Sequence, residues 1–138
     1  MLFRSYDGST LSTKQMAEFY LAADAYVSPY RAEGFNLPVL EASACGIPVI
    51  CTKGGPTDDF LDERFALFID SESKTSNSGG RYLEPNLDHL IQSMLRVMDD
   101  DPWRREASIA GASSASANYS WDAVTDKLIN AIFNCHPS

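Results

Sequence analysis

The sequence predicts an α/β fold with a parallel sheet of about four strands flanked by helices and followed by C-terminal helices. Two apolar runs of strand character, residues 25–28 and 49–51, enclose a glycine turn and a short segment rich in small residues. This order of strand, loop, helix and strand is typical of a parallel sheet. Ligands of such sheets bind beyond the carboxyl ends of the strands, so we expect the functional residues in the loop between the two runs.

The first predicted elements are a short strand at residues 2–5 and a helix capped by the hydroxyl of Ser12 or Thr13. Apolar residues at helical spacing indicate that one face of this helix is buried, which favours a purely structural role. These residues are Met16, Phe19, Tyr20 and Ala23.

The central strand–loop–helix unit begins with a strand at residues 26–28, which Pro29 ends. Asn36 is a candidate N-cap for the next helix, and Pro38 fits its first turn because the missing N–H has no helical partner there. The small residues that follow allow the helix to approach its neighbours closely, and Gly46 suits the left-handed position at its end. A central parallel strand then follows at residues 49–51.

The rest of the chain continues through a glycine loop at residues 52–59 and a fourth strand at 65–69. Residues 71–81 are polar and contain glycines, so we expect a mobile surface loop there. Three helices complete the fold, and their predicted starts are Asn86, Asp101–Pro102 and Ser120. The apolar face of the last helix contains Trp121, Val124, Leu128, Ile129, Ile132 and Phe133.

Composition limits the classes of function. The net charge of −8 argues against nucleic acid or an anionic membrane surface as the main partner. The three cysteines lack metal-ligand spacing, which indicates buried or incidental thiols and no metal site. No apolar run approaches the ~20 residues that a membrane span requires, and we expect a single cytoplasmic domain over residues 1–138.

The central loop has the features of a phosphate site. The backbone N–H groups from Gly34 to Leu37 precede a helix, whose dipole favours anions, and the lack of a side chain at Gly34 permits close approach. Glu41 would be repelled by a phosphate but can accept hydrogen bonds from ribose hydroxyls. Glu33 can bind hydroxyls of the group that the phosphates carry. A simpler interpretation stays open from the pattern: Glu41 compensates the helix dipole, and the glycines only form turns.

Residues 33–50 resemble the signature of retaining GT-B glycosyltransferases, most closely the glycogen-synthase-like and sucrose-synthase-like group, family four or glycosyl transferases group 1. The mark of that group is two glutamates separated by seven residues, matched by Glu33 and Glu41. The resemblance extends through residues 17–25, 54–56 and 119–121. It therefore covers nearly the whole chain.

The resemblance implies roles for individual residues. Glu33 would be the catalytic residue, facing the donor sugar near the reacting carbon, and Glu41 would bind the donor ribose. The remaining donor-binding positions would be Gly34, Phe35, Asn36, Leu37, Gly54 and Gly55. The family transfers a sugar from a nucleoside-diphosphate sugar to an acceptor with retention, usually without a bound metal or other cofactor.

The chain resembles only part of the two-domain fold of this family. It resembles only the latter part of the second, Rossmann-like domain, so we expect a truncated donor domain with a partial Rossmann-like sheet. The acceptor-binding N-terminal domain has no counterpart, nor do the first two donor-domain strands with the basic residues that neutralise the diphosphate. Arg31 and Lys53 are the only nearby substitutes. We therefore expect no transfer by the isolated chain.

The family strand order, 3-2-1-4-5-6, would leave an unpaired edge where the first two strands are missing. Closure by residues 2–3, a complementing N-terminal domain or pairing of two copies would cover it, and we expect a homodimer.

Two other functions stay open. One is a non-catalytic binding or assembly module that keeps the fold, and the other is a phosphate-dependent lyase or epimerase, favoured by fold analogy alone.

Overall fold

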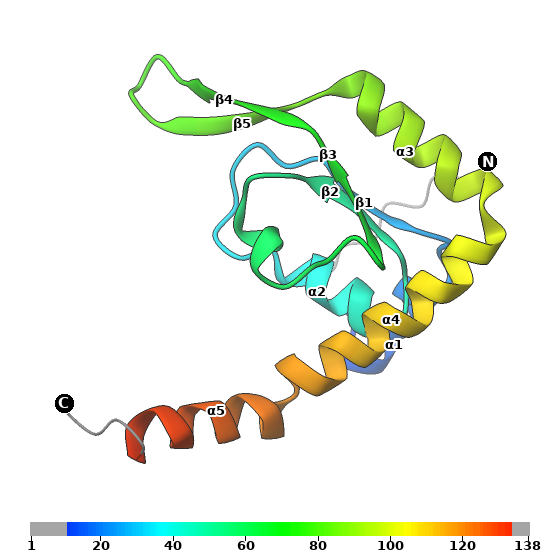
Figure 1. Cartoon of the computed structure of the whole chain (residues 1–138), viewed down its shortest axis with the longest axis vertical. Coiled ribbons are helices and arrows are strands. Elements are labelled where there is room, and N and C mark those ends of the chain that lie inside the picture. Colours follow the sequence, from blue (N-terminus) through cyan, green and yellow to red (C-terminus); the bar gives the residue numbers. More distant parts are fainter. Residues whose placement is uncertain (1–10, 134–138) are drawn as a thin grey trace.

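In the computed structural model, which describes residues 11–133, a small parallel sheet lies between helices (Figure 1). The predicted strand at residues 2–5 lies outside the described residues. The elements in chain order are α1 (Thr13–Leu21), β1 (Tyr26–Ser28), α2 (Leu37–Ala44), β2 (Val49–Thr52), the 3-10 helix η2 (Pro56–Asp59), β3 (Ala66–Ile69), β4 (Ser71–Thr75), β5 (Arg81–Pro85), α3 (Leu87–Asp99), α4 (Asp101–Tyr119) and α5 (Trp121–Phe133).

The sheet has the order β1-β2-β3, and both pairings are parallel. Val49 is opposite Tyr26 on one side and Ala66 on the other, which fixes the register of all three strands. All four residues of β2 are buried, as the continuous apolar run predicts for a central parallel strand. The α/β class and the parallel sheet are confirmed.

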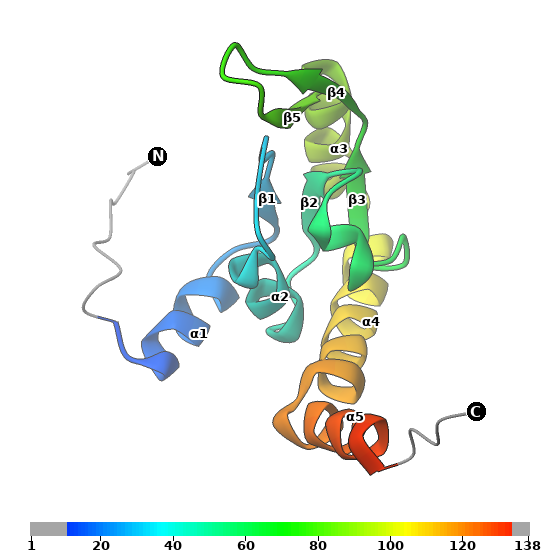
Figure 2. The same cartoon turned by 90° about the vertical axis from the view of Figure 1, so that its left-hand side faces the viewer.

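Helices cover both faces of this sheet (Figure 2). On one face α2 and α4 bury a cluster that includes Val39, Val49 and Cys51, and on the other α3 packs over Ile50 and Ile69. The small residues of α2 allow the predicted close approach, because a Cβ added to Gly111 of α4 would lie only 3.0 Å from the Ser43 hydroxyl.

Most predicted helix ends are confirmed. Ser12 forms a capping box with Gln15, and Asn86 accepts a hydrogen bond from the His89 amide at the start of α3. The predicted buried face of α1 is only partly correct. Tyr20 is 5% exposed, but Phe19 is 50% exposed and Ala23 lies beyond the end of the helix.

The prediction of a mobile loop at residues 71–81 is wrong, because this region forms the antiparallel hairpin β4–β5. Its five-residue connection is closed by hydrogen bonds between Ser76 and Gly80 and from Gly79 to Ser76. Strand β4 is polar throughout and mostly exposed, so it lacks the apolar alternation by which sequence reasoning detects a strand. The hairpin extends beyond the loops that follow β1 and β2 (Figure 1).

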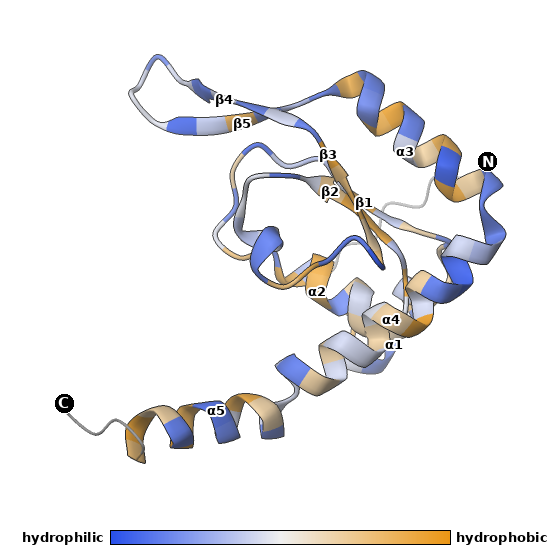
Figure 3. Ribbon diagram, viewed as in Figure 1, coloured by the Kyte–Doolittle hydropathy of each residue, from blue (hydrophilic) through white to orange (hydrophobic). Residues whose placement is uncertain are grey.

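Hydrophobic residues recur along α3 and α5 (Figure 3), and these two helices have the largest sets of exposed apolar side chains in the described residues. On α3 these are Leu87, Ile91, Met94, Leu95 and Met98. On α5 all six residues of the predicted apolar face are exposed, with Trp121 the most exposed at 88%. None of the helices between residues 11 and 133 is both long and apolar enough to cross a bilayer.

Gly46 ends α2 with a φ of +73°, as predicted, and a Cβ there would lie 2.9 Å from the Ser108 hydroxyl and 3.3 Å from the Ser108 carbonyl oxygen. We expect Gly46→Ala to lower the free energy of unfolding by about 2–4 kcal/mol, because backbone strain and overpacking add. Urea denaturation measures this loss of stability.

Gly79→Ala is the matched control, since Gly79 has a φ of +87° with open space around it. Its expected loss is about 1–2 kcal/mol, and equal losses in the two variants would contradict the packing argument.

Candidate functional site

The loop from β1 to α2 is shaped by Asn36, which has a left-handed backbone with φ +69°. Its side chain is 7% exposed and donates a hydrogen bond from Nδ2 to Ser28 Oγ at 3.0 Å. Asn36 occupies the predicted N-cap position, but its side chain makes no cap hydrogen bond, so the predicted capping role is wrong. The side chain instead fastens the loop to the carboxyl end of β1.

The consequence of this turn is a row of available backbone donors. Within residues 11–133, the amides of Gly34, Phe35, Asn36 and Leu37 donate no hydrogen bond. A Cβ at Gly34 would meet no atom within 4 Å, so the backbone there is open to close approach. The Phe35 ring stacks on Phe60 at 4.9 Å and anchors the same loop. Free amides at and just before a helix N-terminus are the kind of donors that bind anions, so the anion site expected from the sequence stays a prediction that this backbone permits.

Glu41 lies in the second turn of α2, where Tyr20 of α1 holds it. The Tyr20 hydroxyl donates to Glu41 Oε2 at 2.8 Å. Burial, followed by this hydrogen bond, raises the pKa of Tyr20 well above its ordinary value. One carboxylate oxygen is therefore fixed, and the other remains available for a ligand hydroxyl. Sequence analysis gave α1 only a structural role and missed Tyr20, although it placed that residue on the inner face.

Glu33 lies in the same loop and lines a cavity of about 300 Å³. The charges of Glu41 and Glu33 both contribute, after burial, to raising the pKa of Tyr26, so the two carboxylates act on one phenol. The other walls of the cavity come from the β2–η2 loop and the hairpin. They include Tyr30, Arg31, Gly54, Ser73, Arg81 and Leu83.

Gly54 and Gly55 have structural reasons to be glycine. Gly54 has a left-handed backbone with φ +93°, its amide donates to Asp58 Oδ2 at 2.9 Å, and it lines the cavity together with Glu33. A Cβ on Gly55 would overlap the Tyr30 ring and hydroxyl, at 2.3 Å from the oxygen. That hydroxyl lies 2.7 Å from Thr57 Oγ1 and thereby joins the two loops. Gly54 is thus at the cavity, whereas Gly55 supports the loop that forms it.

The basic residues near the site differ in their ion-pair partners and in whether they line the cavity. Arg31 binds Glu84 through Nε at 3.2 Å and Nη2 at 2.7 Å, and the interaction raises its pKa. Lys53 does not line the cavity that contains Glu33. Arg81 does line it, and sequence analysis missed this residue because it treated residues 71–81 as a loop.

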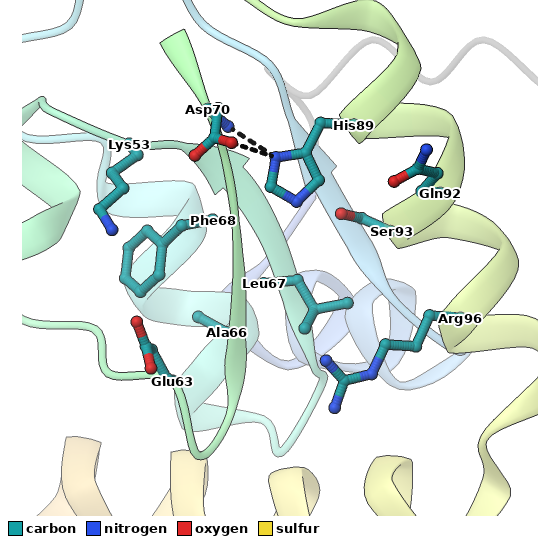
Figure 4. A pocket seen from close by; sticks show the side chains of 10 residues that line it. All are labelled: Lys53, Glu63, Ala66, Leu67, Phe68, Asp70, His89, Gln92, Ser93 and Arg96. Carbon is teal, nitrogen blue, oxygen red and sulfur yellow. Dashed lines mark hydrogen bonds and ion pairs between the residues drawn. The ribbon is translucent and has the colours of Figure 1, made fainter.

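A larger cavity of about 540 Å³ lies along β3 and α3 (Figure 4). Polar side chains such as Lys53, Glu63 and Arg96 line it, and His89 Nδ1 accepts a hydrogen bond from the Asp70 amide at 3.1 Å. It contains none of the predicted site residues. Asn86 caps α3 through the His89 amide, and none of residues 34–37 lines this cavity.

The cysteines and acidic groups form no further site in the described part of the chain. Cys51 is buried, which raises the pKa of its thiol to about 11, and Cys45 is half-buried. Cys135 lies outside the described residues. No group of three or more His, Cys, Asp or Glu side chains among residues 11–133 is placed to hold a metal ion.

Comparison with known proteins gives one family. The family model described as glycosyl transferases group 1 matches residues 9–113. The O-antigen chain mannosyltransferase B of Escherichia coli is 33% identical over 113 residues, which cover 81% of this chain and 26% of that protein. The D-inositol 3-phosphate glycosyltransferase 1 of Catenulispora acidiphila is 31% identical over 115 residues, with 83% and 24% covered.

The fold is also similar to that of a solved enzyme. A sucrose-phosphate synthase from Thermosynechococcus elongatus superposes with a TM-score of 0.67 and 25% sequence identity, over 91% of this chain and 29% of that chain. The chain therefore spans about a quarter of the length of these relatives.

The Tyr20–Glu41 hydrogen bond predicts a pH-dependent contribution to stability. The folded state raises the Tyr20 pKa, so its contribution is complete below the unfolded value near 10 and is lost as the pH rises above it. We expect Tyr20→Phe to lower the free energy of unfolding by about 1 kcal/mol at neutral pH and to reduce the loss of stability above pH 10. Urea titrations from pH 7 to 11 measure both.

Tyr82→Phe is the control, since the Tyr82 hydroxyl makes no hydrogen bond within residues 11–133. An unchanged alkaline slope in Tyr20→Phe would contradict the prediction.

Proposed function

The chain belongs to the glycosyl transferases group 1 family, and we propose that it forms the donor-binding part of a glycosyltransferase that transfers a sugar from a nucleoside-diphosphate sugar with retention. The observation that carries the proposal is the row of four free amides beside two carboxylates, Glu33 and Glu41. The names of the relatives describe mannosyl and other glycosyl transfer, which supports a sugar as the transferred group.

In this proposal each group has one task. The amides of residues 34–37 bind the diphosphate, because a helix N-terminus favours anions. Glu41, oriented by Tyr20, accepts hydrogen bonds from the ribose hydroxyls with its free oxygen. Glu33, which lines the cavity, faces the donor sugar. The amides take the place that a metal ion has in other phosphate sites, so the proposal includes no cofactor.

Transfer to an acceptor needs groups beyond this chain, and we propose that the isolated chain binds donor without transferring its sugar. The relatives are about four times as long as the matched segment, which supports a contribution from another domain or chain. The apolar surfaces of α3 and α5 support the same proposal, because folded proteins seldom leave such stripes open to water.

Titration of the purified chain with UDP, GDP and ADP, followed by calorimetry, tests donor binding. We expect saturable binding of one nucleotide and a 10- to 100-fold weaker affinity in Glu41→Ala, roughly the contribution of hydrogen bonds to a charged group. Glu106→Ala is the control, since Glu106 is an exposed glutamate on α4 away from the site. No binding by the folded chain up to millimolar nucleotide would overturn the proposal and favour a binding or assembly module that keeps the fold.

We further propose that the free edge of β1 is covered in solution by a second copy of the chain. Among residues 11–133, β1 pairs with β2 alone, and Val27 at the open edge is 37% exposed. Sedimentation velocity at micromolar concentration should show a dimer, and Val27→Lys should dissociate it because charged residues disfavour edge pairing. Ile109→Lys, at an exposed apolar position on α4, is the control. A monomeric wild-type chain would defeat the homodimer and leave a complementing domain as the partner to seek.

A further inference from the structure

The hairpin β4–β5 is built into the candidate donor site. The Leu83 amide donates to the Arg31 carbonyl oxygen at 2.8 Å, which joins β5 to the loop that contains Glu33. On the other strand, the Ser71 hydroxyl donates to the Lys53 carbonyl oxygen at 2.7 Å, at the start of the β2–η2 loop. The ion pair between Arg31 and Glu84 adds a third connection. The hairpin therefore forms a fixed wall of the cavity.

Most cations in the described part of the chain are bound to a carboxylate. Ion pairs to Asp or Glu occupy Lys14, Arg31, Arg64, Lys74, Arg96, Arg104 and Arg105. Within residues 11–133, Arg81 forms no ion pair, and its one hydrogen bond runs from Nη2 to Ser73 Oγ at 3.0 Å. A guanidinium has five N–H donors, so most of those of Arg81 remain available.

The cavity needs such a cation if it takes a nucleoside diphosphate. Its lining contains the carboxylate of Glu33, and Arg31 is already neutralised by Glu84. The amides of residues 34–37 follow Glu33 in the chain but do not line the cavity, and a helix N-terminus supplies only about half a positive charge. Arg81 lines the same cavity as Glu33 and Gly54 and is the one cation there without a carboxylate partner in the described residues. A planar guanidinium also matches the geometry of phosphate oxygens.

We propose that Arg81, presented by the hairpin β4–β5, binds the diphosphate of the nucleotide in the cavity lined by Glu33 and Gly54. This assignment rests on the proposed function and names a group that neutralises the donor's charge. The hairpin thereby supplies an unpaired positive charge to the lining of this cavity, where Arg31 of the β1–α2 loop is already paired with Glu84.

Calorimetric titration of the full chain with UDP, GDP and ADP, and with the matching monophosphates and nucleosides, tests the assignment. In Arg81→Ala we expect roughly 10- to 100-fold weaker binding of the diphosphate that the wild-type chain binds, with a smaller effect on its monophosphate and little on its nucleoside. Arg81→Lys should recover part of the loss, because it keeps the charge without the bidentate geometry. Lys74→Ala is the matched control, a cation on the same hairpin that is paired with Glu72 and does not line the cavity.

The outcomes separate this assignment from the proposed function. Unchanged diphosphate affinity in Arg81→Ala, together with loss in Glu41→Ala, overturns the role of Arg81 and leaves donor binding standing. An equal loss for diphosphate and nucleoside also overturns it, because the effect would not depend on phosphate. No nucleotide binding by the wild-type chain overturns the proposed function and the assignment of Arg81 with it. Thermal unfolding of each variant confirms that the hairpin change leaves the core intact.

Discussion

The site depends on the left-handed turn at Asn36. Residues 29–36 connect β1 to α2 and must bring the chain back toward the carboxyl end of β1, where the buried Asn36 side chain donates a hydrogen bond to Ser28. Asparagine is among the few residues that adopt this backbone at low cost. The Asn36 side chain is used for the turn and does not cap α2, and the amides of residues 34–37 donate no hydrogen bond within residues 11–133.

The electrostatics of the site follow from which groups are already bound. The chain carries a net charge of −8, so an anionic ligand approaches against the overall field. Tyr20 holds one oxygen of Glu41, Glu84 holds Arg31, and Asp58 holds the Gly54 amide. These contacts hold the loops in position, and the polar groups that form them are not free to bind a ligand. The amides of residues 34–37 stay unpaired within the described part of the chain. Because the loop is preorganised, binding of an anion there would cost little conformational entropy.

The sequence predicted the parts of this fold that local patterns determine. The parallel strands follow from apolar runs, and Ser12, Gly46 and Asn86 mark helix ends through their own backbone chemistry. The hairpin could not be recognised, because β4 is polar and its strands are held by ladder bonds and by contacts to distant loops. For the same reason the pattern could not show that Tyr20 reaches Glu41, a contact across 21 residues. The resemblance located the site residues, whereas their hydrogen-bond partners required tertiary structure.

The size of the cavity links the site to the exposed surfaces. At about 300 Å³ it is at the lower limit of ligand sites, and such sites normally bury most of the ligand. Sugar transfer to an acceptor also requires that water be kept from the reacting carbon. The hairpin and the β2–η2 loop form two walls, and nothing else in residues 11–133 closes the side on which Glu33 is exposed. The proposed function therefore requires another surface to close this side, and the exposed apolar stripes on α3 and α5 are the surfaces that such a partner would cover.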